Sequence, residues 1–309
     1  MTPQIDRLLL GDNPLIGVDH LSQERARERL ERLNTGRIVE VIETATANGA
    51  QGFLFSTHPT IYAALKAIRQ AEAQTPLNLY PLLPYAQAYV RTATEKGVLG
   101  LVQDVLGKLS WRGRMKALAA GLSMATADPA TVLNAYVDAE LDILTSNAPE
   151  GSVLKSVIMH EVITDVATSF KAGDILQSYA AHVIDEYKVK PGFATRNFPR
   201  FVRFADQIGL EFSDIVILTP FNKVGFQMNP SREACEETLK RDRMADANII
   251  AMSILASGYL KLPEATQYLS KLNQLKSIVV GTSSREHAKK TFTYLSRNPP
   301  FSAAKNPSA

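Results

Sequence analysis

Short runs of apolar residues alternate with longer stretches of mixed polarity along most of the chain. Eight runs, each bounded by Gly, Pro, Asn, Asp or Ser, predict short buried strands. They lie at 7–13, 52–55, 77–83, 156–161, 190–197, 214–218, 248–253 and 278–281. Apolar positions at helical spacing between these runs predict helices at 23–32, 38–48, 60–72, 173–187, 199–208, 230–246, 263–275 and 286–296.

The alternation of strands and helices predicts an α/β fold with a parallel sheet. Eight strand–helix units can close into a barrel that has no edge strand. We therefore expect a (β/α)8 TIM barrel that spans residues 1–309 as one domain. A doubly wound open sheet is the competing fold, but the segment GDNPLIG at 11–17 has the wrong spacing for a glycine-rich dinucleotide-binding loop.

Residues 86–149 interrupt this alternation. They hold three helical patterns, at 86–106, 111–124 and 129–144, which is more helix than one crossover needs. We expect a helical insertion after the third strand that acts as a lid, as the surface of a homodimer, or as packing around the barrel. The tail 298–309 is rich in Pro, Ser and Ala and is expected to be flexible.

The composition excludes several classes of protein. The 309 residues are 45% hydrophobic and 21% charged with a net charge of +3, and no basic run with interleaved aromatic residues indicates nucleic-acid binding. The single cysteine, Cys235, excludes an internal disulfide and fits a reducing compartment, and its acidic neighbours disfavour a thiolate. We find no signal peptide and no run of ~18 apolar residues, so we expect a cytoplasmic protein without a membrane span.

Polar residues gather where the predicted strands end. In a parallel barrel such residues line one pocket, and a polar, titratable ring suits acid–base chemistry or phosphate recognition on a small molecule. The ring consists of Asp12, Asn13, His58, Tyr85, His160, Glu161, Thr195, Arg196, Asn197, Asn222, Lys223 and Ser253.

His160 is the leading acid–base candidate, because an imidazole can donate and accept; a core histidine bonded to the backbone is the alternative. Adjacent strand residues point to opposite sides, so we expect His160 to face the pocket and Glu161 to face away. Asp12, His20, His58 and His160 are suitable metal ligands. No HxH or HxxxE spacing supports a metal site, however, and none is predicted.

Arg196 and Lys223 place two cations at neighbouring strand ends. Together with Asp12 and Asn13 they are candidate substrate-binding residues, able to clamp a phosphate or a carboxylate. The alternative is a structural ion pair, for example with Asp12 or Glu161.

The segment SIVVGTSSREHAK at 277–289 carries an apolar run into Gly281, after which Thr282, Ser283 and Ser284 precede a predicted helix. Unpaired backbone N–H groups at a helix start attract anions, and the last strand-to-helix loops of such barrels often bind phosphate. An ordinary serine helix cap is the alternative.

Several strand ends resemble those of the aldo-keto reductases, a superfamily of NADP-dependent (β/α)8 barrels. The matching segments are VIMH at 157–160, PGFATRNF at 191–198, ILTPFN at 217–222, NIIAMSILASG at 248–258 and IVVGTSSREHAKKTF at 278–292. The resemblance implies an NADP-dependent oxidoreductase that acts on a small carbonyl or phosphorylated substrate, with His160 as the histidine of the catalytic tetrad. It also implies cofactor contacts from Asn197, Asn222, Ser253, Ser283, Ser284 and Arg285.

The rest of the tetrad is altered. In FSTHPTIY at 55–62 the family's Asp and Tyr have no clear counterparts; Tyr62 is the only tyrosine nearby, and His58 stands where a polar group can substitute. The family's lysine is missing from LLPY at 82–85, and Met252 replaces the tyrosine that stacks on nicotinamide. Since a tyrosine without that lysine is a poor acid, we expect an altered catalytic set of Tyr85, His58 and His160.

Two other functions stay open at this point. The barrel could be a lyase or isomerase of a sugar-like or phosphorylated substrate that uses His160, Glu161 or Lys223, or a non-catalytic ligand-binding barrel.

Overall fold

A computed structural model describes residues 4–17, 34–72, 74–84 and 129–301 of the chain. Tyr85, the predicted helix at 23–32 and the first two predicted helices of the insertion lie outside these ranges, as do residues 302–309 of the predicted flexible tail.

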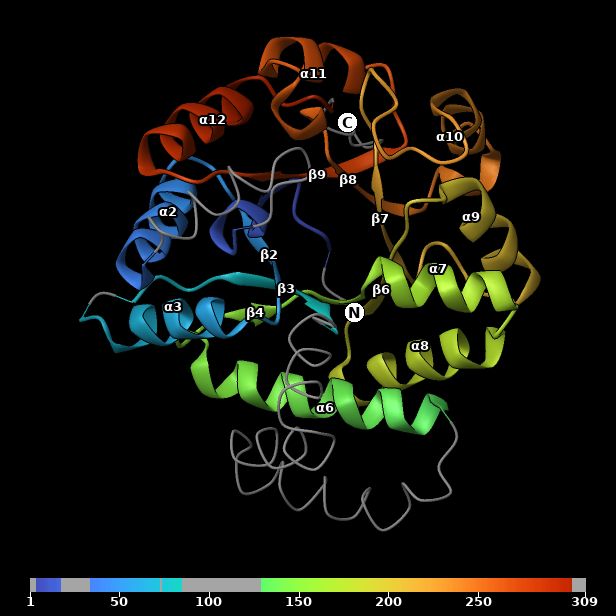
Figure 1. The fold of residues 1–309 in the computed structure, drawn as a ribbon, viewed down its shortest axis with the longest axis horizontal. Coiled ribbons are helices and arrows are strands. Elements are labelled where there is room, and N and C mark those ends of the chain that lie inside the picture. Colours follow the sequence, from blue (N-terminus) through green and yellow to red (C-terminus); the bar gives the residue numbers. More distant parts are fainter. Residues whose placement is uncertain (1–3, 18–33, 73, 85–128, 302–309) are drawn as a thin grey trace, which may run out of the picture.

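Eight parallel strands form a closed ring, as Figure 1 shows. They are β1 (Leu8–Gly11), β2 (Gly52–Ser56), β3 (Asn78–Leu83), β5 (Ser156–Met159), β6 (Lys190–Ala194), β7 (Val216–Pro220), β8 (Asn248–Met252) and β9 (Leu275–Gly281). Each strand pairs with the next, and β9 pairs with β1 to close the ring. The short β4 (Val153–Leu154) pairs with β3 outside it. The predicted (β/α)8 TIM barrel is therefore confirmed.

Helices surround the ring on its outer side (Figure 1). In the described ranges they are α2 (Thr35–Ala47), α3 (Pro59–Gln70), α6 (Pro129–Asn147), α7 (Glu161–Phe170), α8 (Gly173–Tyr187), α9 (Phe198–Gln207), α10 (Arg232–Leu239), α11 (Leu262–Leu269) and α12 (Arg285–Arg297). Three short 3-10 helices lie among them: η1 (Asn13–Leu15), η2 (Asp242–Met244) and η3 (Ala256–Gly258). None of the helices described is long and apolar enough to cross a membrane.

Several predicted boundaries were wrong. The helix predicted at 263–275 ends at Leu269, and β9 already begins at Leu275. The strand predicted at 156–161 ends at Met159, and α7 follows at once where no helix was predicted. The helix predicted at 230–246 breaks after Leu239, where the chain turns into η2 and buries Met244. The strand predicted at 214–218 lies two residues later, at Val216–Pro220.

Two apolar layers stabilise the barrel, because successive strand residues point alternately into the ring and toward the helices. The inner layer includes Leu9, Leu54, Ile158, Leu218, Ile250 and Val279. The outer layer is larger and packs the opposite faces of the strands against the helices. Burial on both faces explains why the strands read as nearly continuous apolar runs in the sequence.

A polar contact lies near the start of the barrel strands. Tyr80, inside the ring, donates its hydroxyl hydrogen to Asp6 Oδ2 at 2.8 Å, and its oxygen accepts the Asp6 N–H at 2.7 Å. Asn78 donates to the other Asp6 oxygen at 3.1 Å. These groups satisfy one another, which suits a structural role at this end and leaves the opposite end for the site.

Gly11 and Gly281 lie side by side where β1 and β9 end. A Cβ on Gly281 would be 2.6 Å from Pro14 Cδ, so only glycine lets η1 pack against the end of β9. The seam between the first and last strands is thus closed tightly at the level where the strand-end loops begin.

Candidate functional site

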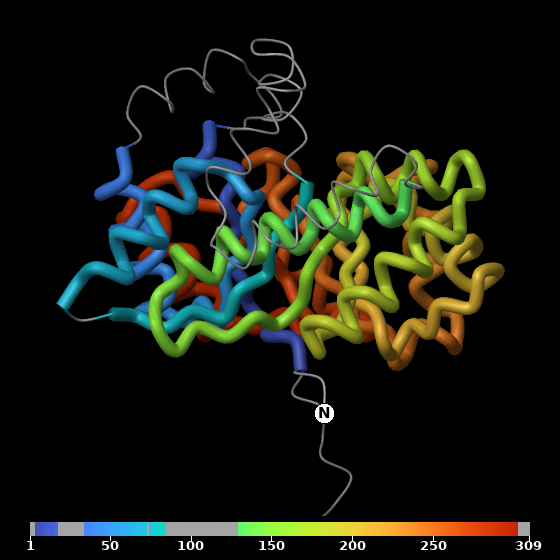
Figure 2. Tube along the Cα trace, turned by 90° about the horizontal axis from the view of Figure 1, so that it is seen from below, coloured from blue at the N-terminus to red at the C-terminus, as the bar shows by residue number. Residues whose placement is uncertain are grey.

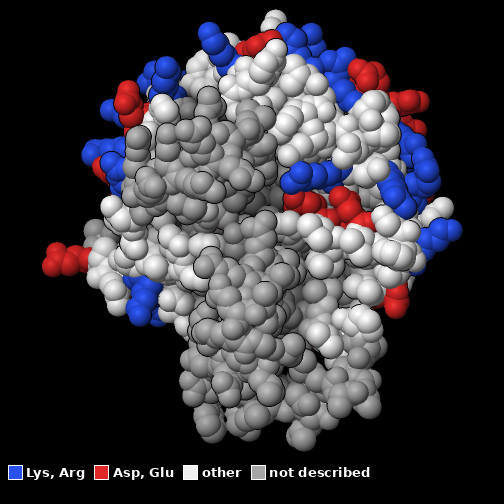
Figure 3. Space-filling view, in the orientation of Figure 1, with Lys and Arg blue, Asp and Glu red and all other residues white. Residues whose placement is uncertain are grey.

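The carboxyl ends of the eight ring strands meet at one end of the barrel because all eight are parallel. Figure 2 shows the chain entering at the opposite end, next to the label N, and crossing the barrel with β1. Figure 3 shows the molecule from the side of the carboxyl ends; a small group of acidic and basic side chains lies right of centre, beside grey atoms and within a largely uncharged surface.

Two histidines at this mouth cap helices in the same way. His58 Nδ1 accepts the Thr60 N–H at 3.1 Å as the N-cap of α3, and His160 Nδ1 accepts the Val162 N–H at 3.2 Å as the N-cap of α7. A ring nitrogen that accepts must be unprotonated, so in each neutral imidazole Nε2 carries the hydrogen. Burial lowers the pKa of His58, which favours this neutral form.

His160 and Glu161 do not lie on opposite faces of a strand, as the sequence suggested. Because β5 ends at Met159, His160 begins a helical turn and Glu161 is its first residue. The turn brings Glu161 Oε2 to 3.4 Å from His160 Nδ1. Glu161 is therefore a direct neighbour of the imidazole.

Arg196, at the end of β6, forms an ion pair with Glu161. Its Nε and Nη2 both donate to Glu161 Oε1, at 3.2 and 2.8 Å. Its backbone N–H donates to Asp165 Oδ2 at 3.1 Å, and Thr195 donates its hydroxyl hydrogen to Asp165 Oδ1 at 2.5 Å. Two carboxylates one turn apart on α7 thus hold the β6 loop beside His160.

Asp165 was not among the predicted site residues. Burial raises its pKa, and the hydrogen bonds from Thr195 and Arg196 oppose that effect. The signal in the sequence was the spacing of four residues between Glu161 and Asp165, which puts two acids on one face of a helix. It was missed because no helix was predicted there.

Asp12, after β1, is only 3% exposed. Its Oδ2 accepts the backbone N–H of Ser56, at the end of β2, at 2.8 Å. Burial raises the pKa of Asp12 to about 7, although the hydrogen bond from Ser56 favours the charged form. Asp12 therefore ties two neighbouring strand ends together below the surface, whereas Asn13 is exposed.

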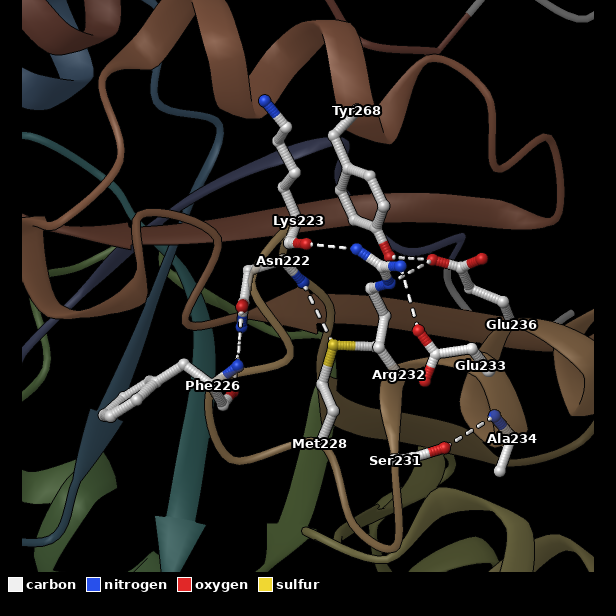
Figure 4. Close-up of polar contacts among 10 residues, drawn as sticks. All are labelled: Asn222, Lys223, Phe226, Met228, Ser231, Arg232, Glu233, Ala234, Glu236 and Tyr268. Carbon is white, nitrogen blue, oxygen red and sulfur yellow. Dashed lines mark hydrogen bonds and ion pairs between the residues drawn. The ribbon is translucent and has the colours of Figure 1, made fainter.

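Asn222, predicted as a cofactor contact, is fully buried and committed to its own loop (Figure 4). Its side-chain Nδ2 donates to Phe226 O and its Oδ1 accepts the Phe226 N–H, both at 2.8 Å. Its backbone N–H approaches Met228 Sδ at 3.3 Å. These two hydrogen bonds fix the conformation of the loop between β7 and α10.

The side chain of Lys223, the next residue, points away from Asn222 and Phe226 (Figure 4). Its Nζ donates to Glu264 Oε1 at 2.6 Å, and both side chains are about half exposed. Its carbonyl oxygen accepts from Arg232 Nη1 at 2.6 Å. The ammonium is therefore held in an ion pair with Glu264, which disfavours a Schiff-base role.

Ser253, after β8, has the left-handed φ of 55°, and Gln227 opposite has φ 61°. The Ser253 hydroxyl donates weakly to Gln227 Oε1 at 3.3 Å. Asn197, after β6, caps α9 by accepting the Arg200 N–H at 3.3 Å. These two predicted cofactor contacts lie at strand ends, but Asn197 already serves its helix.

The segment after β9 combines a helix start with a buried hydroxyl that has no partner. Ser284 caps α12 by accepting the His287 N–H at 3.3 Å, so the predicted cap is present. Thr282 is 6% exposed, and its Oγ1 has no hydrogen-bond partner among the residues that the structure describes. Ser283 between them is half-buried.

Arg285 begins α12 and is 69% exposed in its side chain; it pairs with Glu40 of α2 at 3.1 Å. Exposed pairs of this kind contribute little to stability, so the guanidinium can leave Glu40 for another anion at small cost.

The ring order decides which candidates face one another. His160 and Arg196 follow the neighbouring strands β5 and β6, and Ser253 and Ser283 follow the neighbouring strands β8 and β9. β5 and β9 are four places apart in either direction around the ring, so His160 and Ser283 lie on opposite sides of the mouth, whereas Arg196 and Ser253 are only two places apart. Tyr85, the third predicted catalytic residue, lies outside the described residues.

Tyr62 is not available as a proton donor at this mouth. Its hydroxyl donates to the buried Glu140 of α6 at 2.7 Å, and burial together with Glu140 raises the pKa of Tyr62 well above its usual range.

Among the described residues no group of three or more His, Cys, Asp or Glu side chains is arranged to hold a metal.

Comparison with known proteins supports the barrel fold. No protein-family model matches the sequence, and no curated protein sequence matches it. Solved structures do match: aldo-keto reductase AKR11C1 from Bacillus halodurans, in its holo form, superimposes with a TM-score of 0.52 at 10% identity, over 94% of this chain and 86% of that one. A Pseudomonas aeruginosa protein assigned to the aldo-keto reductases gives a TM-score of 0.51 at 10% identity, over 95% and 91% of the two chains.

At this identity the likeness concerns the fold alone. The chain has the (β/α)8 barrel fold found in aldo-keto reductases, as the sequence resemblance led us to expect. What it binds and which reaction it performs have to be argued from its own residues.

Proposed function

We propose that the chain is an oxidoreductase that binds NADP(H) across the mouth of the barrel and acts on a small carbonyl substrate. The observation that supports it most is that an anion-binding segment and a candidate acid–base residue lie on opposite sides of the same mouth. On one side lie the buried hydroxyl of Thr282 and the start of α12; on the other lies His160, held by α7 and facing Glu161.

The β9–α12 segment suits the phosphate end of such a cofactor. The first turn of α12 leaves backbone N–H groups unpaired, since Ser284 satisfies only that of His287. Within the described part of the chain Thr282 Oγ1 is a buried donor without an acceptor, and a phosphate oxygen would satisfy it. Arg285 adds an exposed guanidinium that its weak pair with Glu40 can release.

The neighbouring loops shape the rest of the cofactor site. Gly281 is exposed and has no side chain, so a ligand can approach the backbone at the end of β9. Ser253 offers a hydroxyl whose bond to Gln227 is long and easily replaced. Asn222 contributes by fixing the β7–α10 loop and not through its buried amide.

Bound NADPH would supply the hydride for reduction of the carbonyl carbon. His160 would stabilise the negative charge that develops on the carbonyl oxygen, because its neutral form carries a hydrogen on Nε2. Protonation at Nδ1 would exchange the Val162 N–H contact for an ion pair with Glu161, which is already 3.4 Å away. Both protonation states of His160 are therefore accommodated, as a residue that passes a proton requires.

Arg196 would complete the substrate side. The guanidinium of Arg196 uses two nitrogens on Glu161 and is 35% exposed, so its remaining N–H groups can reach a carboxylate or phosphate of the substrate. His58, the second capping histidine, follows β2 at the same mouth.

Titration with NADPH tests the proposal. We expect enhanced nicotinamide fluorescence with a Kd in the micromolar range and a rise in the thermal midpoint, since a ligand that binds only the folded state stabilises it. Thr282→Val should weaken binding roughly fivefold to tenfold without lowering the stability of the free protein, because the lost hydroxyl has no partner to leave behind.

Thr238→Val is the matched control. Thr238 is also buried, but its hydroxyl donates to Ala234 O within α10, which follows β7 and not β9. This variant should leave NADPH affinity unchanged. Absence of any NADPH response would contradict the proposal; stabilisation by a sugar phosphate instead would support the lyase or isomerase, and no response to either would support a barrel with another ligand.

The lyase or isomerase function has less support in the geometry. Lys223 is paired with Glu264 at the exposed rim, and Glu161 is paired with Arg196. Of the three acid–base groups that this function would use, only His160 has a nitrogen left for a substrate, and the oxidoreductase uses the same residue.

A further inference from the structure

Arg232, the first residue of α10, is a cation at the end of a helix that favours negative charge. Two carboxylates of the same helix surround its guanidinium: Nη2 donates to Glu233 Oε1 at 2.8 Å, and Nε lies 3.4 Å from Glu236 Oε1. Tyr268 of α11 donates to the same Glu236 oxygen at 2.7 Å. The guanidinium is therefore held in one orientation by two helices.

The third nitrogen of this guanidinium points at the β7–α10 loop, residues 221–231. Nη1 donates to the carbonyl oxygen of Lys223 at 2.6 Å, as Figure 4 shows. A short hydrogen bond from a charged donor is stronger than one between neutral groups. The Arg232 side chain also packs on the backbone of Gly225, where an added Cβ would be 3.4 Å from Arg232 Cβ. Arg232 thus anchors the first half of the loop to α10.

The β7–α10 loop contacts the loops on both sides of it. In the ring β7 lies between β6 and β8. On the β6 side the Asn229 N–H donates to Arg196 O at 3.0 Å. On the β8 side the Ser253 hydroxyl donates to Gln227 Oε1 at 3.3 Å. The loop therefore joins the arginine proposed to hold the substrate to a serine proposed to contact the cofactor.

Gln227 lies between the anchored half of the loop and the contact with Arg196. Its left-handed φ of 61° is a conformation that a residue with a side chain keeps only when its surroundings impose it. The Asn222 amide and the Arg232 guanidinium fix the part of the loop that precedes it. Without the Arg232 anchor we expect Gln227 to relax and both contacts with the neighbouring loops to weaken.

We propose that the β7–α10 loop couples the two sides of the mouth, and that Arg232 is the positioning residue that holds the loop for this purpose. Arg232 is not among the residues proposed to contact a ligand; it acts through the Lys223 carbonyl. A cofactor that orders Ser253 restrains Gln227, and through Asn229 it restrains Arg196, so each ligand favours binding of the other. The inference rests on the proposed function, because NADP(H) and the substrate are the ligands that it couples.

Hydrogen exchange of the ligand-free chain, measured by mass spectrometry, tests the positioning. Arg232→Met keeps an apolar side chain of similar length but removes the donors, so peptides from 221–231 should exchange about tenfold faster than in the parent. Arg232→Lys keeps a cationic donor and should restore most of the protection. Arg243→Met is the matched control: Arg243 also pairs with two carboxylates, Asp206 and Glu211, and its loss should leave 221–231 unchanged. Unchanged exchange of 221–231 in Arg232→Met overturns the positioning.

Exchange with saturating NADPH tests the coupling. In the parent, peptides from both 253–258 and 194–198 should exchange about threefold to fivefold more slowly once NADPH is bound. Arg232→Met should keep the effect at 253–258 and lose it at 194–198, because the connection between them runs through the β7–α10 loop. A residue that only stabilises α10 would not produce this split. Protection at 194–198 that persists in Arg232→Met, or that is missing in the parent while 253–258 is protected, overturns the coupling.

The two measurements separate this inference from the proposed function. A parent chain in which no peptide responds to NADPH contradicts the proposed function and the coupling together, whereas the ligand-free exchange decides the role of Arg232 in either case. If Arg232→Met does not accumulate as folded protein, Arg232→Gln takes its place with the same expected results, because its side chain is too short to reach the Lys223 carbonyl.

Discussion

Arg196 and Glu161 meet at a single oxygen: both Nε and Nη2 of the guanidinium donate to Oε1, at 3.2 and 2.8 Å. This leaves Oε2 of Glu161 for His160, whose Nδ1 lies 3.4 Å away. One carboxylate therefore joins the end of β5 to the end of β6 and supports both the imidazole and the arginine of the proposed site.

Glu161→Gln should lower turnover. The amide leaves the Arg196 guanidinium without its ion pair, so the arginine and the neighbouring His160 are held less firmly and kcat/KM should fall roughly tenfold to 100-fold. The loss of stability should be modest, about 0.5–1 kcal/mol, because Arg196 is partly exposed. Glu264→Gln, which breaks the exposed ion pair with Lys223, is the control and should leave kcat/KM unchanged.

His160→Asn should distinguish the role of His160 as a helix N-cap from its role in catalysis. Asparagine is a good N-cap and can accept the Val162 N–H as Nδ1 does, so the free energy of unfolding should stay within about 0.5 kcal/mol of the parent, whereas His160→Ala should lose about 1 kcal/mol. Both variants should lose at least ~100-fold in kcat, as expected for a group that assists proton transfer. Full turnover in His160→Asn would show that the histidine is only a cap.

Gly281→Ala should destabilise the closure of the barrel. The added Cβ would be 2.6 Å from Pro14 Cδ, and overpacking of this kind costs about 1–3 kcal/mol. Pro14→Ala in the same chain removes the ring atoms that clash and should restore much of the loss. Thermal or urea unfolding of the two single variants and the double variant measures the coupling; strictly additive effects would contradict the contact.

Asp12 should make the protein less stable as pH rises. Its pKa is about 7 in the folded state and 3.8 ordinarily, so the folded state holds the proton more tightly. The stabilisation is complete below pH ~4, falls between the two values, and is lost above pH ~7. At 1.36 kcal/mol per pKa unit the loss is on the order of 4 kcal/mol.

Asp12→Asn should abolish this component, since a neutral amide can still accept the Ser56 N–H. Urea unfolding at pH 5 and pH 8 measures the difference between variant and parent. Because burial also raises the pKa of Glu140 to about 7, the comparison requires the Asp12→Asn and Glu140→Gln variants separately and combined; an Asp12→Asn chain with the full pH dependence of the parent would contradict the assignment.

Local patterns in the sequence determined the barrel. Strands such as Gly52–Ser56 and Asn248–Met252 are buried on both faces, so each reads as an apolar run between turn residues without knowledge of its partners. The same pattern located the strand ends, and with them His58, His160, Arg196 and Thr282. These features depend on neighbours in the chain, which is why they could be predicted.

Only the tertiary structure decided what those residues bond to. The hydrogen bonds join residues far apart in the sequence: 35 residues separate Arg196 from Glu161, 44 separate Asp12 from Ser56, and 78 separate Tyr62 from Glu140. Closure of the ring brings such pairs together, and desolvation then selects the partners, because a buried polar group that lacks one is costly. The amide of Asn222 closed on Phe226, and the hydroxyls of Thr57 and Thr282 left without partners, could therefore be recognised only once the barrel had formed.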